Sequence, residues 1–220
     1  PMREILIAVG SGEDGEQLLS PAQFIPAAEQ FGRMASVDRW VIRRVLEWCR
    51  DNPRQANGVG TFTINLAGST LGDAGLVDYL SGEFARTGIA PGRICFELSE
   101  TVAVQNLARV ADLVTQIRRM GCHFALDDVG TGYGSNDYLA TLPVDFIKVD
   151  GSFVRQIVDD ETDAAIVSSI NELAHHLGKT TIAEYVENEP ILERLEAIGI
   201  DYVQGYGVGS PESLDDLPLV

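Results

Sequence analysis

The chain has 220 residues, enough for one α/β domain with a full core but short for two. Its formal net charge of -17 disfavours binding to duplex nucleic acid and to acidic membrane surfaces, because both repel a negative field. No apolar run reaches the length of a membrane helix, so we expect no membrane insertion of this segment. Cys49, Cys95 and Cys122 are scattered and lack metal-ligand spacing, which favours reduced thiols and a cytoplasmic location.

The first part of the chain predicts one strand and two helices. The strand covers residues 3–9, and a polar loop follows over 10–15. Ser20 and Pro21 then begin a helix, since serine is a favoured N-cap and proline is favoured at the first helical position. This helix presents one apolar face: Phe24, Ile25, Ala28 and Phe31. The second helix starts at Ser36, and we expect its regularly spaced apolar side chains to lie in the core: Trp40, Val41, Val45, Leu46 and Trp48.

From residue 61 onward, predicted strands alternate with predicted helices. The strands cover 61–66, 93–98, 123–128, 145–150, 180–184 and 202–206, and the helices cover 75–87, 107–120, 136–140, 160–177 and 189–198. This alternation implies right-handed crossovers and a parallel sheet covered by helices. With the first strand there are seven, so an eight-stranded barrel requires a truncated or displaced first strand in a fragment cut from a longer protein. An open doubly wound sheet is the alternative, although no glycine-rich phosphate loop follows the first strand.

One stretch ends an apolar run in two adjacent acids, Asp127 and Asp128, before a glycine-rich loop. This pattern is typical of a buried parallel strand that carries acid groups to its C-terminal end, where barrel enzymes hold their active sites. Two neighbouring carboxylates both ionise at low cost only when a cation lies between them, so the pair indicates a divalent metal. The alternative is an Asp-Asp pair that caps the next helix.

Every predicted strand carries a polar residue or pair in or at its end: Glu4, Asn65, Glu97, Asp127 with Asp128, Lys148, Glu184 and Gln204. Acids and amides in a barrel interior are costly unless they bind something. Oxygen donors without a histidine or cysteine cluster favour Mg²⁺ or Mn²⁺, and the carboxylates suffice for two ions that share one bridging carboxylate. Lys148 can hold a phosphate oxygen or a water, or else form a structural ion pair with Asp127 or Asp150.

These residues and their neighbours resemble the ordered motifs of the EAL domain family over almost the whole chain. The matching segments are Glu4-Ile5-Leu6, Ile64-Asn65-Leu66, Phe96-Glu97-Leu98-Ser99-Glu100, Leu126-Asp127-Asp128-Val129-Gly130-Thr131-Gly132-Tyr133, Ile147-Lys148-Val149-Asp150, Ala183-Glu184-Tyr185-Val186-Glu187 and Gln204-Gly205-Tyr206. The resemblance implies a single EAL-like domain over residues 1–220, built as a modified (β/α)8 barrel of the TIM type with one antiparallel strand. It also implies a phosphodiesterase that opens cyclic di-GMP to linear pGpG.

The resemblance further assigns a role to each matching position. Glu4, Asn65, Glu97 and Asp127 would hold one Mg²⁺ or Mn²⁺, and Asp127, Asp128 and Glu184 would hold the other. Lys148 and Gln204 would orient water or phosphate, with Glu184 or Lys148 as general base. Glu100 would brace the loop over 129–135, and Glu187 would support the site without touching the ions.

Several positions depart from the family pattern. Ala8 stands where the family usually has an arginine that contacts ligand phosphate, Tyr185 replaces a usual glycine, Val129 a common phenylalanine, and Asn136 a usual leucine. Loss of a charge-assisted contact costs about 1.5–3 kcal/mol, or roughly ten- to a hundredfold in affinity. None of these changes removes a metal ligand, so we expect a competent enzyme whose activity Ala8, Tyr185 and the N-terminal truncation reduce.

Two other functions are kept as alternatives. A catalytically weak or inactive EAL domain would act as a cyclic di-GMP receptor. A barrel enzyme with Mg²⁺ and Lys148 as base would instead take a carbon-bound proton from a carboxylate substrate. The resemblance also implies upstream sensory or GGDEF-type domains in a parent chain, which can be tethered to a membrane. It implies a homodimer formed through the loop after Asp128 and the helix that follows it.

Overall fold

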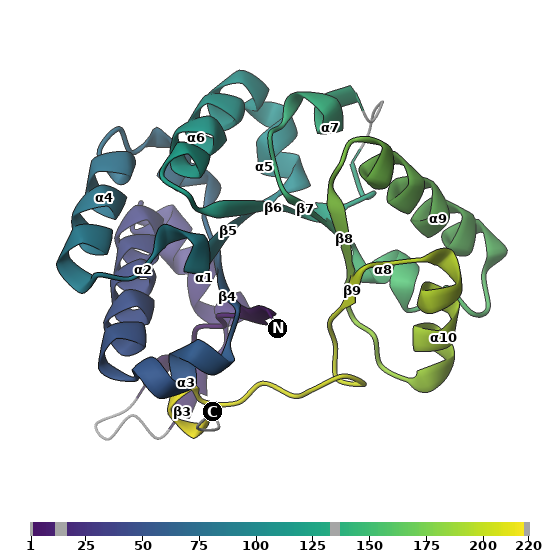
Figure 1. The fold of residues 1–220 in the computed structure, drawn as a ribbon, viewed down its shortest axis with the longest axis horizontal. Coiled ribbons are helices and arrows are strands. Elements are labelled where there is room, and N and C mark those ends of the chain that lie inside the picture. Colours follow the sequence, from purple (N-terminus) through teal and green to yellow (C-terminus); the bar gives the residue numbers. More distant parts are fainter. Residues whose placement is uncertain (1, 12–16, 133–136, 218–220) are drawn as a thin grey trace. The chain divides into compact units, whose positions relative to one another are not determined.

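The computed structural model describes residues 2–11, 17–132 and 137–217, in which strands and helices largely alternate as predicted (Figure 1). Residues 12–15 of the predicted first loop, and Asn136, lie outside the described residues. The chain divides into two units: unit 1 is Pro1–Phe96, Arg119–Cys122 and Asp215–Val220, and unit 2 is Glu97–Arg118 and His123–Leu214. In the described part of the chain, no helix is both long and apolar enough to cross a membrane.

In unit 1, strand β1 (Met2–Glu4) pairs in parallel with β4 (Thr61–Asn65), with Glu4 opposite Thr63. The prediction of one strand over 3–9 is therefore wrong in its second half. The chain leaves β4 after Ile5, whose N–H donates to the Thr63 carbonyl at 2.9 Å. Val9–Ser11 instead forms β2, which pairs antiparallel with β3 (Gln17–Leu19). In the sequence, residues 3–9 look like one continuous apolar strand. The parallel partner β4, however, bonds only the residues up to Ile5.

Four helices complete unit 1: α1 (Pro21–Gln30), α2 (Met34–Asp51), α3 (Pro53–Gly58) and α4 (Leu76–Thr87). Short 3-10 turns occur at η1 (Gly68–Gly72) and η2 (Pro91–Arg93), and η3 (Leu214–Asp216) lies near the chain end. Gly88 ends α4 in the left-handed conformation, with φ 72°, as its position after the predicted helix suggests. The sequence did not predict α3.

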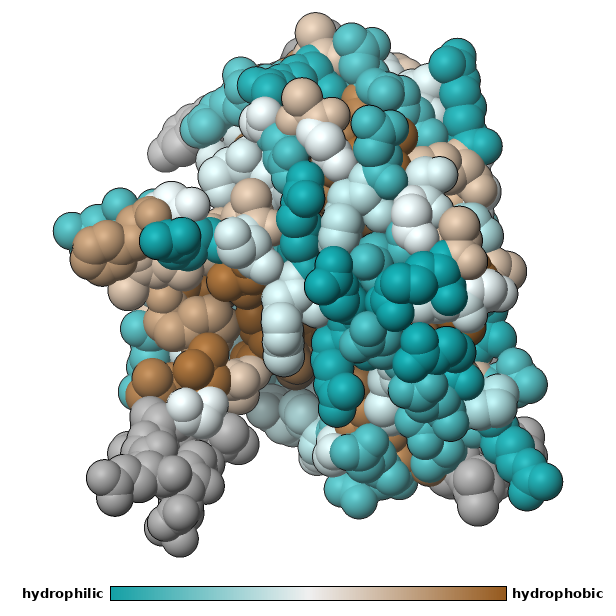
Figure 2. All heavy atoms as spheres, turned by 90° about the vertical axis from the view of Figure 1, so that its left-hand side faces the viewer, coloured by the Kyte–Doolittle hydropathy of each residue, from teal (hydrophilic) through white to brown (hydrophobic). Residues whose placement is uncertain are grey.

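The core prediction for α2 is confirmed for most residues but wrong for Trp40. Val41, Val45, Leu46 and Trp48 are buried, whereas 61% of Trp40 is exposed. Trp40 lies on the helix face with the exposed Arg43 and Arg44, so its position along the chain, not its size, decides its exposure. In α1 no residue is fully buried, and Phe31 is exposed. Figure 2 shows the side of the molecule that lies to the left in Figure 1. Most of its surface is hydrophilic, with a hydrophobic area next to the grey residues.

In unit 2, four strands pair in parallel in chain order: β6 (His123–Val129), β7 (Phe146–Val149), β8 (Thr180–Ala183) and β9 (Tyr202–Val203). Strand β5 (Ile94–Ser99) contributes its first half to unit 1 and its second half to unit 2. The three parallel pairings among β6, β7, β8 and β9 bring the C-terminal ends of these strands to the same edge. The parallel α/β prediction is confirmed for this part of the chain.

The helices of unit 2 are α5 (Glu100–Gln105), α6 (Leu107–Arg119), α7 (Asp137–Thr141), α8 (Gly151–Val154), α9 (Glu161–His176) and α10 (Glu189–Ile198). Figure 1 shows α9 and α10 on the outer side of β8 and β9. The sequence did not predict α5 and α8, because each is too short to show a helical period. Both begin directly after a strand end that carries predicted site residues.

A polar network anchors the start of β8 in unit 2. Asp201 accepts hydrogen bonds from the Thr181 N–H at 2.8 Å and the Thr181 hydroxyl at 3.0 Å, and it lies 2.9 Å from His175 Nε2. Burial alone would raise the pKa of Asp201, but the bonds from Thr181 and His175 lower it on balance. A lowered pKa means that this carboxylate stabilises the fold above the ordinary aspartate pKa, and that the contribution is lost as pH falls through the lowered value.

We expect Asp201→Ala to lower the free energy of unfolding by about 1–3 kcal/mol at pH 7, because it leaves the buried Thr181 N–H without an acceptor. The deficit should shrink in acid, where the wild-type carboxylate is itself protonated. Urea denaturation at pH 7 and at pH values below the ordinary aspartate pKa measures both effects. Asp201→Asn retains an oxygen acceptor and should lose less; an equal loss in both variants would contradict this explanation.

Candidate active site

The acidic pair at the end of β6 is shaped by an irregularity in that strand. Leu126 lies opposite Ile147 and Val129 opposite Val149, so β6 has one more residue than β7 over this interval. Asp128 has φ 57°, in the left-handed region that few non-glycine residues occupy. In a regular strand, Asp127 and Asp128 would point to opposite faces. The bulge and the positive φ redirect them, and the Asp128 N–H donates to Asp127 Oδ1 at 3.0 Å.

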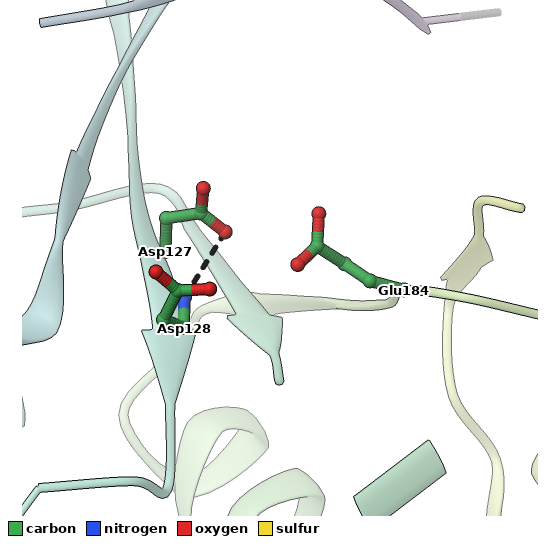
Figure 3. Close-up of side chains that lie close together, drawn as sticks. All are labelled: Asp127, Asp128 and Glu184. Carbon is green, nitrogen blue, oxygen red and sulfur yellow. Dashed lines mark hydrogen bonds between the residues drawn. The ribbon is translucent and has the colours of Figure 1, made fainter. Parts of the chain in front are cut away.

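Glu184, directly after β8, completes an oxygen-rich cluster with this pair. Single carboxylate oxygens of Asp127, Asp128 and Glu184 all lie within 4.8 Å of one another. Figure 3 shows Glu184 directed toward the two aspartates from the neighbouring part of the sheet. This geometry confirms that the structure brings together the three residues predicted to share an ion.

Lys148 on β7 lies among three carboxylates of unit 2. Its Nζ is 2.9 Å from Glu97 Oε2, 2.8 Å from Glu184 Oε1 and 3.3 Å from Asp127 Oδ1. Lys148 and Glu97 are each only 1% exposed. The proposed structural pair with Asp127 is thus present, while Asp150 instead accepts a hydrogen bond from the Ser152 N–H at 2.8 Å. One ammonium group serves three acids, so the cluster retains excess negative charge.

Asp128 shows this excess most clearly. Burial, together with the neighbouring carboxylates of Asp127 and Asp150, raises the pKa of Asp128 to about 6, and Lys148 only partly opposes this. A raised carboxyl pKa indicates that the site lacks positive charge. Hard oxygen donors with a shortage of positive charge are suited to a divalent cation such as Mg²⁺ or Mn²⁺.

Glu4 and Asn65 form a separate pair within unit 1. Asn65 Nδ2 donates to Glu4 Oε1 at 2.8 Å, from the ends of the paired strands β1 and β4. The structure therefore places these two residues side by side. Their participation in an ion site with Glu97 and Asp127 stays a prediction.

Glu100, the first residue of α5, holds the chain directly after β6. Its Oε2 accepts hydrogen bonds from the N–H groups of Gly130 at 3.0 Å and Gly132 at 3.1 Å. The Tyr138 hydroxyl donates to the other carboxylate oxygen. A Cβ on Gly132 would lie 2.5 Å from Glu100 Oε1, so glycine allows this close approach. These contacts are consistent with the bracing role expected for Glu100, and they add Tyr138, which the sequence reading did not select.

Gln204 and Glu187 occupy the backbone segments after β9 and β8. The Gln204 N–H donates to the Ala183 carbonyl at 2.8 Å, and its own carbonyl accepts from Val186 N–H at 3.0 Å. Glu187 Oε1 lies 3.5 Å from Arg155 Nε. The catalytic or supporting roles expected for both side chains stay predictions. Arg155 was not selected from the sequence, because nothing near it in the chain indicates the contact.

A cavity of about 430 Å³ lies at the opposite, N-terminal ends of β6, β7 and β8, with Arg118, Asp145 and Lys179 in its lining. Its cations are used by the fold. Arg118 pairs with Asp145 at 2.6 Å, and Lys179 Nζ donates to the carbonyls of Leu142 and Val144 at 2.8 and 3.1 Å. We therefore place the active site at the acidic end of the strands and not in this cavity.

We expect Lys148→Met to lower the free energy of unfolding of the metal-free protein by about 3–5 kcal/mol, because three carboxylates lose their shared cation. Urea denaturation measures the loss. The double variant Lys148→Met with Glu97→Gln should regain part of it, since one negative charge is then removed. A Lys148→Met protein as stable as wild type would contradict the assignment, and Lys148→Arg serves as the variant that keeps the charge.

We expect Glu100→Ala to accelerate amide hydrogen exchange at Gly130 and Gly132 by about ten- to a hundredfold, because hydrogen bonds to a charged acceptor contribute about 1.5–3 kcal/mol. NMR exchange measurements resolve the two amides. Tyr138→Phe is the matched control, since it removes the third partner of Glu100 and keeps the carboxylate. Unchanged protection in Glu100→Ala would show that the carboxylate does not hold this segment.

Known proteins share both the sequence and the fold. Residues 3–211 match the family model described as EAL domain. Over 198 residues the chain is 42% identical to the cyclic di-GMP phosphodiesterase PdeB of Shewanella oneidensis, covering 90% of this chain and 23% of that protein. Over 213 residues it is 38% identical to the cyclic di-GMP phosphodiesterase PdeF of Escherichia coli, covering 97% of this chain and 28% of that protein. The chain thus spans only about a quarter of these relatives.

A solved structure of the PaMucR phosphodiesterase in complex with c-di-GMP superposes with a TM-score of 0.90 at 30% identity, covering 98% of this chain and 86% of that chain. The FimX EAL domain from Pseudomonas aeruginosa bound to c-di-GMP gives a TM-score of 0.88 at 27% identity, covering 99% and 86%. These structures share the TIM-like α/β fold that the family resemblance implied. The chain therefore belongs to the EAL domain family.

Proposed function

We propose that this domain hydrolyses cyclic di-GMP to linear pGpG. Its relatives PdeB and PdeF are named cyclic di-GMP phosphodiesterases. The observation that carries the proposal is the cluster of Asp127, Asp128 and Glu184 around one point, next to the buried Lys148. Hydrolysis breaks one P–O3′ bond, adds water to the phosphorus, and leaves a 5′-phosphate and a 3′-hydroxyl. The site therefore has to orient a water and stabilise extra negative charge on the phosphate.

Two divalent ions, Mg²⁺ or Mn²⁺, fit the donor set, because the acids supply only oxygen ligands and Asp128 shows a shortage of positive charge. Glu4, Asn65, Glu97 and Asp127 would hold one ion, and Asp127, Asp128 and Glu184 the other. When bound, such ions activate water and withdraw charge from phosphate oxygens.

Side chains of this chain would transfer the proton and position the water and the phosphate. Glu184 or Lys148 would take the proton of the attacking water. The Glu184 carboxylate can accept it directly, whereas Lys148, which lies 2.8 Å from Glu184, would first have to give up its own proton. Gln204 orients water or phosphate, Glu100 keeps residues 130 and 132 in place, and Glu187 supports the segment after Glu184.

The proposal also concerns the parent protein to which these residues belong. We propose a complete modified (β/α)8 barrel with one antiparallel strand, to which this chain contributes strands β1 and β4–β9. We further propose a cytoplasmic homodimer with upstream sensory or GGDEF-type domains. A further cyclase-type domain in the parent chain is supported by MucR of Pseudomonas aeruginosa, 32% identical over 200 residues, which is named a bifunctional diguanylate cyclase/cyclic di-GMP phosphodiesterase and of which the match covers 29%.

The experiment is a turnover assay with cyclic di-GMP, in which we expect pGpG release with Mg²⁺ or Mn²⁺ and none in excess chelator. Glu97→Ala should lower kcat/KM by more than about 100-fold, because it removes an ion ligand and leaves Lys148 with one acid fewer. Glu196→Ala, an exposed glutamate on α10, is the charge-matched control and should retain activity. Full turnover with chelator present would disprove the two-ion account.

The second candidate function is a cyclic di-GMP receptor, which the alanine at position 8 favours because an expected phosphate contact is absent. Calorimetry separates the two functions. Tight binding of cyclic di-GMP without turnover at high Mn²⁺ would establish the receptor and exclude the enzyme.

A further inference from the structure

Tyr185 combines an unusual backbone with an accessible ring, and it directly follows Glu184 of the acidic cluster in the chain. Its φ is 55°, and 46% of it is exposed. The left-handed conformation costs a non-glycine residue roughly 1–2 kcal/mol. Hydrogen bonds on both sides hold it there: Glu184 N–H donates to the Val149 carbonyl at 3.4 Å, and Val186 N–H to the Gln204 carbonyl at 3.0 Å.

The ring of Tyr185 has a defined position rather than a free one. It packs on Gly151, where an added Cβ would overlap the ring carbons, so a side chain at position 151 and a tyrosine at 185 exclude each other. The guanidinium carbon of Arg155 lies 4.0 Å from the ring centroid, within the range of a cation–π contact. Arg155 is also 3.5 Å from Glu187, which limits its own freedom. The aromatic surface is thus oriented before any ligand arrives.

We propose that Tyr185 stacks on one guanine base of cyclic di-GMP at the rim of the acidic site, held in place by Gly151 and Arg155. This inference rests on the proposed function and adds a residue that determines base affinity. Three observations support it. The ring is half exposed, it follows a residue of the acidic cluster directly, and it is preorganised, so little side-chain entropy is lost on binding.

Charge makes the position more favourable still. Cyclic di-GMP carries two phosphodiester charges, and the chain has a net charge of -17. Arg155 lies over one face of the ring and supplies a cation close to the exposed part on which the base stacks, which favours the approach of an anionic nucleotide. Aromatic stacking on a base contributes about 1–3 kcal/mol, enough to offset much of the affinity lost with the phosphate contact at position 8.

The test compares Tyr185→Leu, Tyr185→Phe and Tyr202→Leu in the turnover assay at saturating Mn²⁺. Leucine keeps an apolar side chain and the same backbone demand but has no aromatic face, so Tyr185→Leu should raise KM by about 5- to 100-fold and change kcat less than about twofold. Tyr185→Phe keeps the face and should match wild type. Tyr202 is a similarly exposed tyrosine in β9, and Tyr202→Leu should leave both constants unchanged.

Calorimetry of cyclic di-GMP binding in excess chelator keeps this inference distinguishable from the proposed hydrolysis. Binding by wild type in chelator, together with no pGpG release at saturating Mn²⁺, disproves hydrolysis, while a 5- to 100-fold weaker Kd for Tyr185→Leu still supports stacking. Wild-type turnover with the KM of Tyr185→Leu unchanged overturns stacking alone. A fall in kcat at constant KM also overturns it, because the residue would then act on the chemistry and not on the base.

Discussion

The buried contact between Lys148 and its three carboxylates is the interaction on which the site depends. Glu97, Asp127 and Glu184 come from β5, β6 and the end of β8, and each lies within 3.3 Å of the same ammonium group. Without a shared cation, carboxylates at this distance and depth would repel one another and open the strand ends. The lysine therefore allows acids from three strands to be held together, and the negative charge that it does not neutralise is what makes the site attractive to divalent ions.

Backbone irregularity is the second constraint, and it occurs where the acids are. Asp128 and Tyr185 are the non-glycine residues with positive φ among those described, and each adjoins a residue of the acidic cluster or belongs to it. A regular β6 would direct Asp127 and Asp128 to opposite faces, so the bulge is the feature that lets two consecutive acids serve one site. Strain of this kind persists only where the surrounding contacts hold it, here the pairing with β7 and the bonds of Val186 and Gln204.

The effect of a residue that departs from the family pattern depends on the residues that contact it. From the sequence, we expect the tyrosine at position 185 to reduce activity, because it replaces a usual glycine. In the structure its ring packs on Gly151 and under Arg155, so a residue at a distant position in the chain provides the space that it needs. The alanine at position 8 removes an expected phosphate contact, which keeps the receptor function in consideration.

The sequence by itself determined the class of fold, the alternation of strands and helices, and the acids at the strand ends, because period, capping residues and polar interruptions of apolar runs are local signals. It misjudged the stretch after Ile5, the exposure of Trp40 and the short helices α5 and α8, where partners distant in the chain decide the outcome. Only the tertiary structure decided that Lys148 is shared by three acids, that Glu100 bonds Gly130 and Gly132, and that Tyr185 lies against Gly151. These contacts join residues tens of positions apart, so their geometry depends on strand register and backbone conformation, which no local pattern specifies.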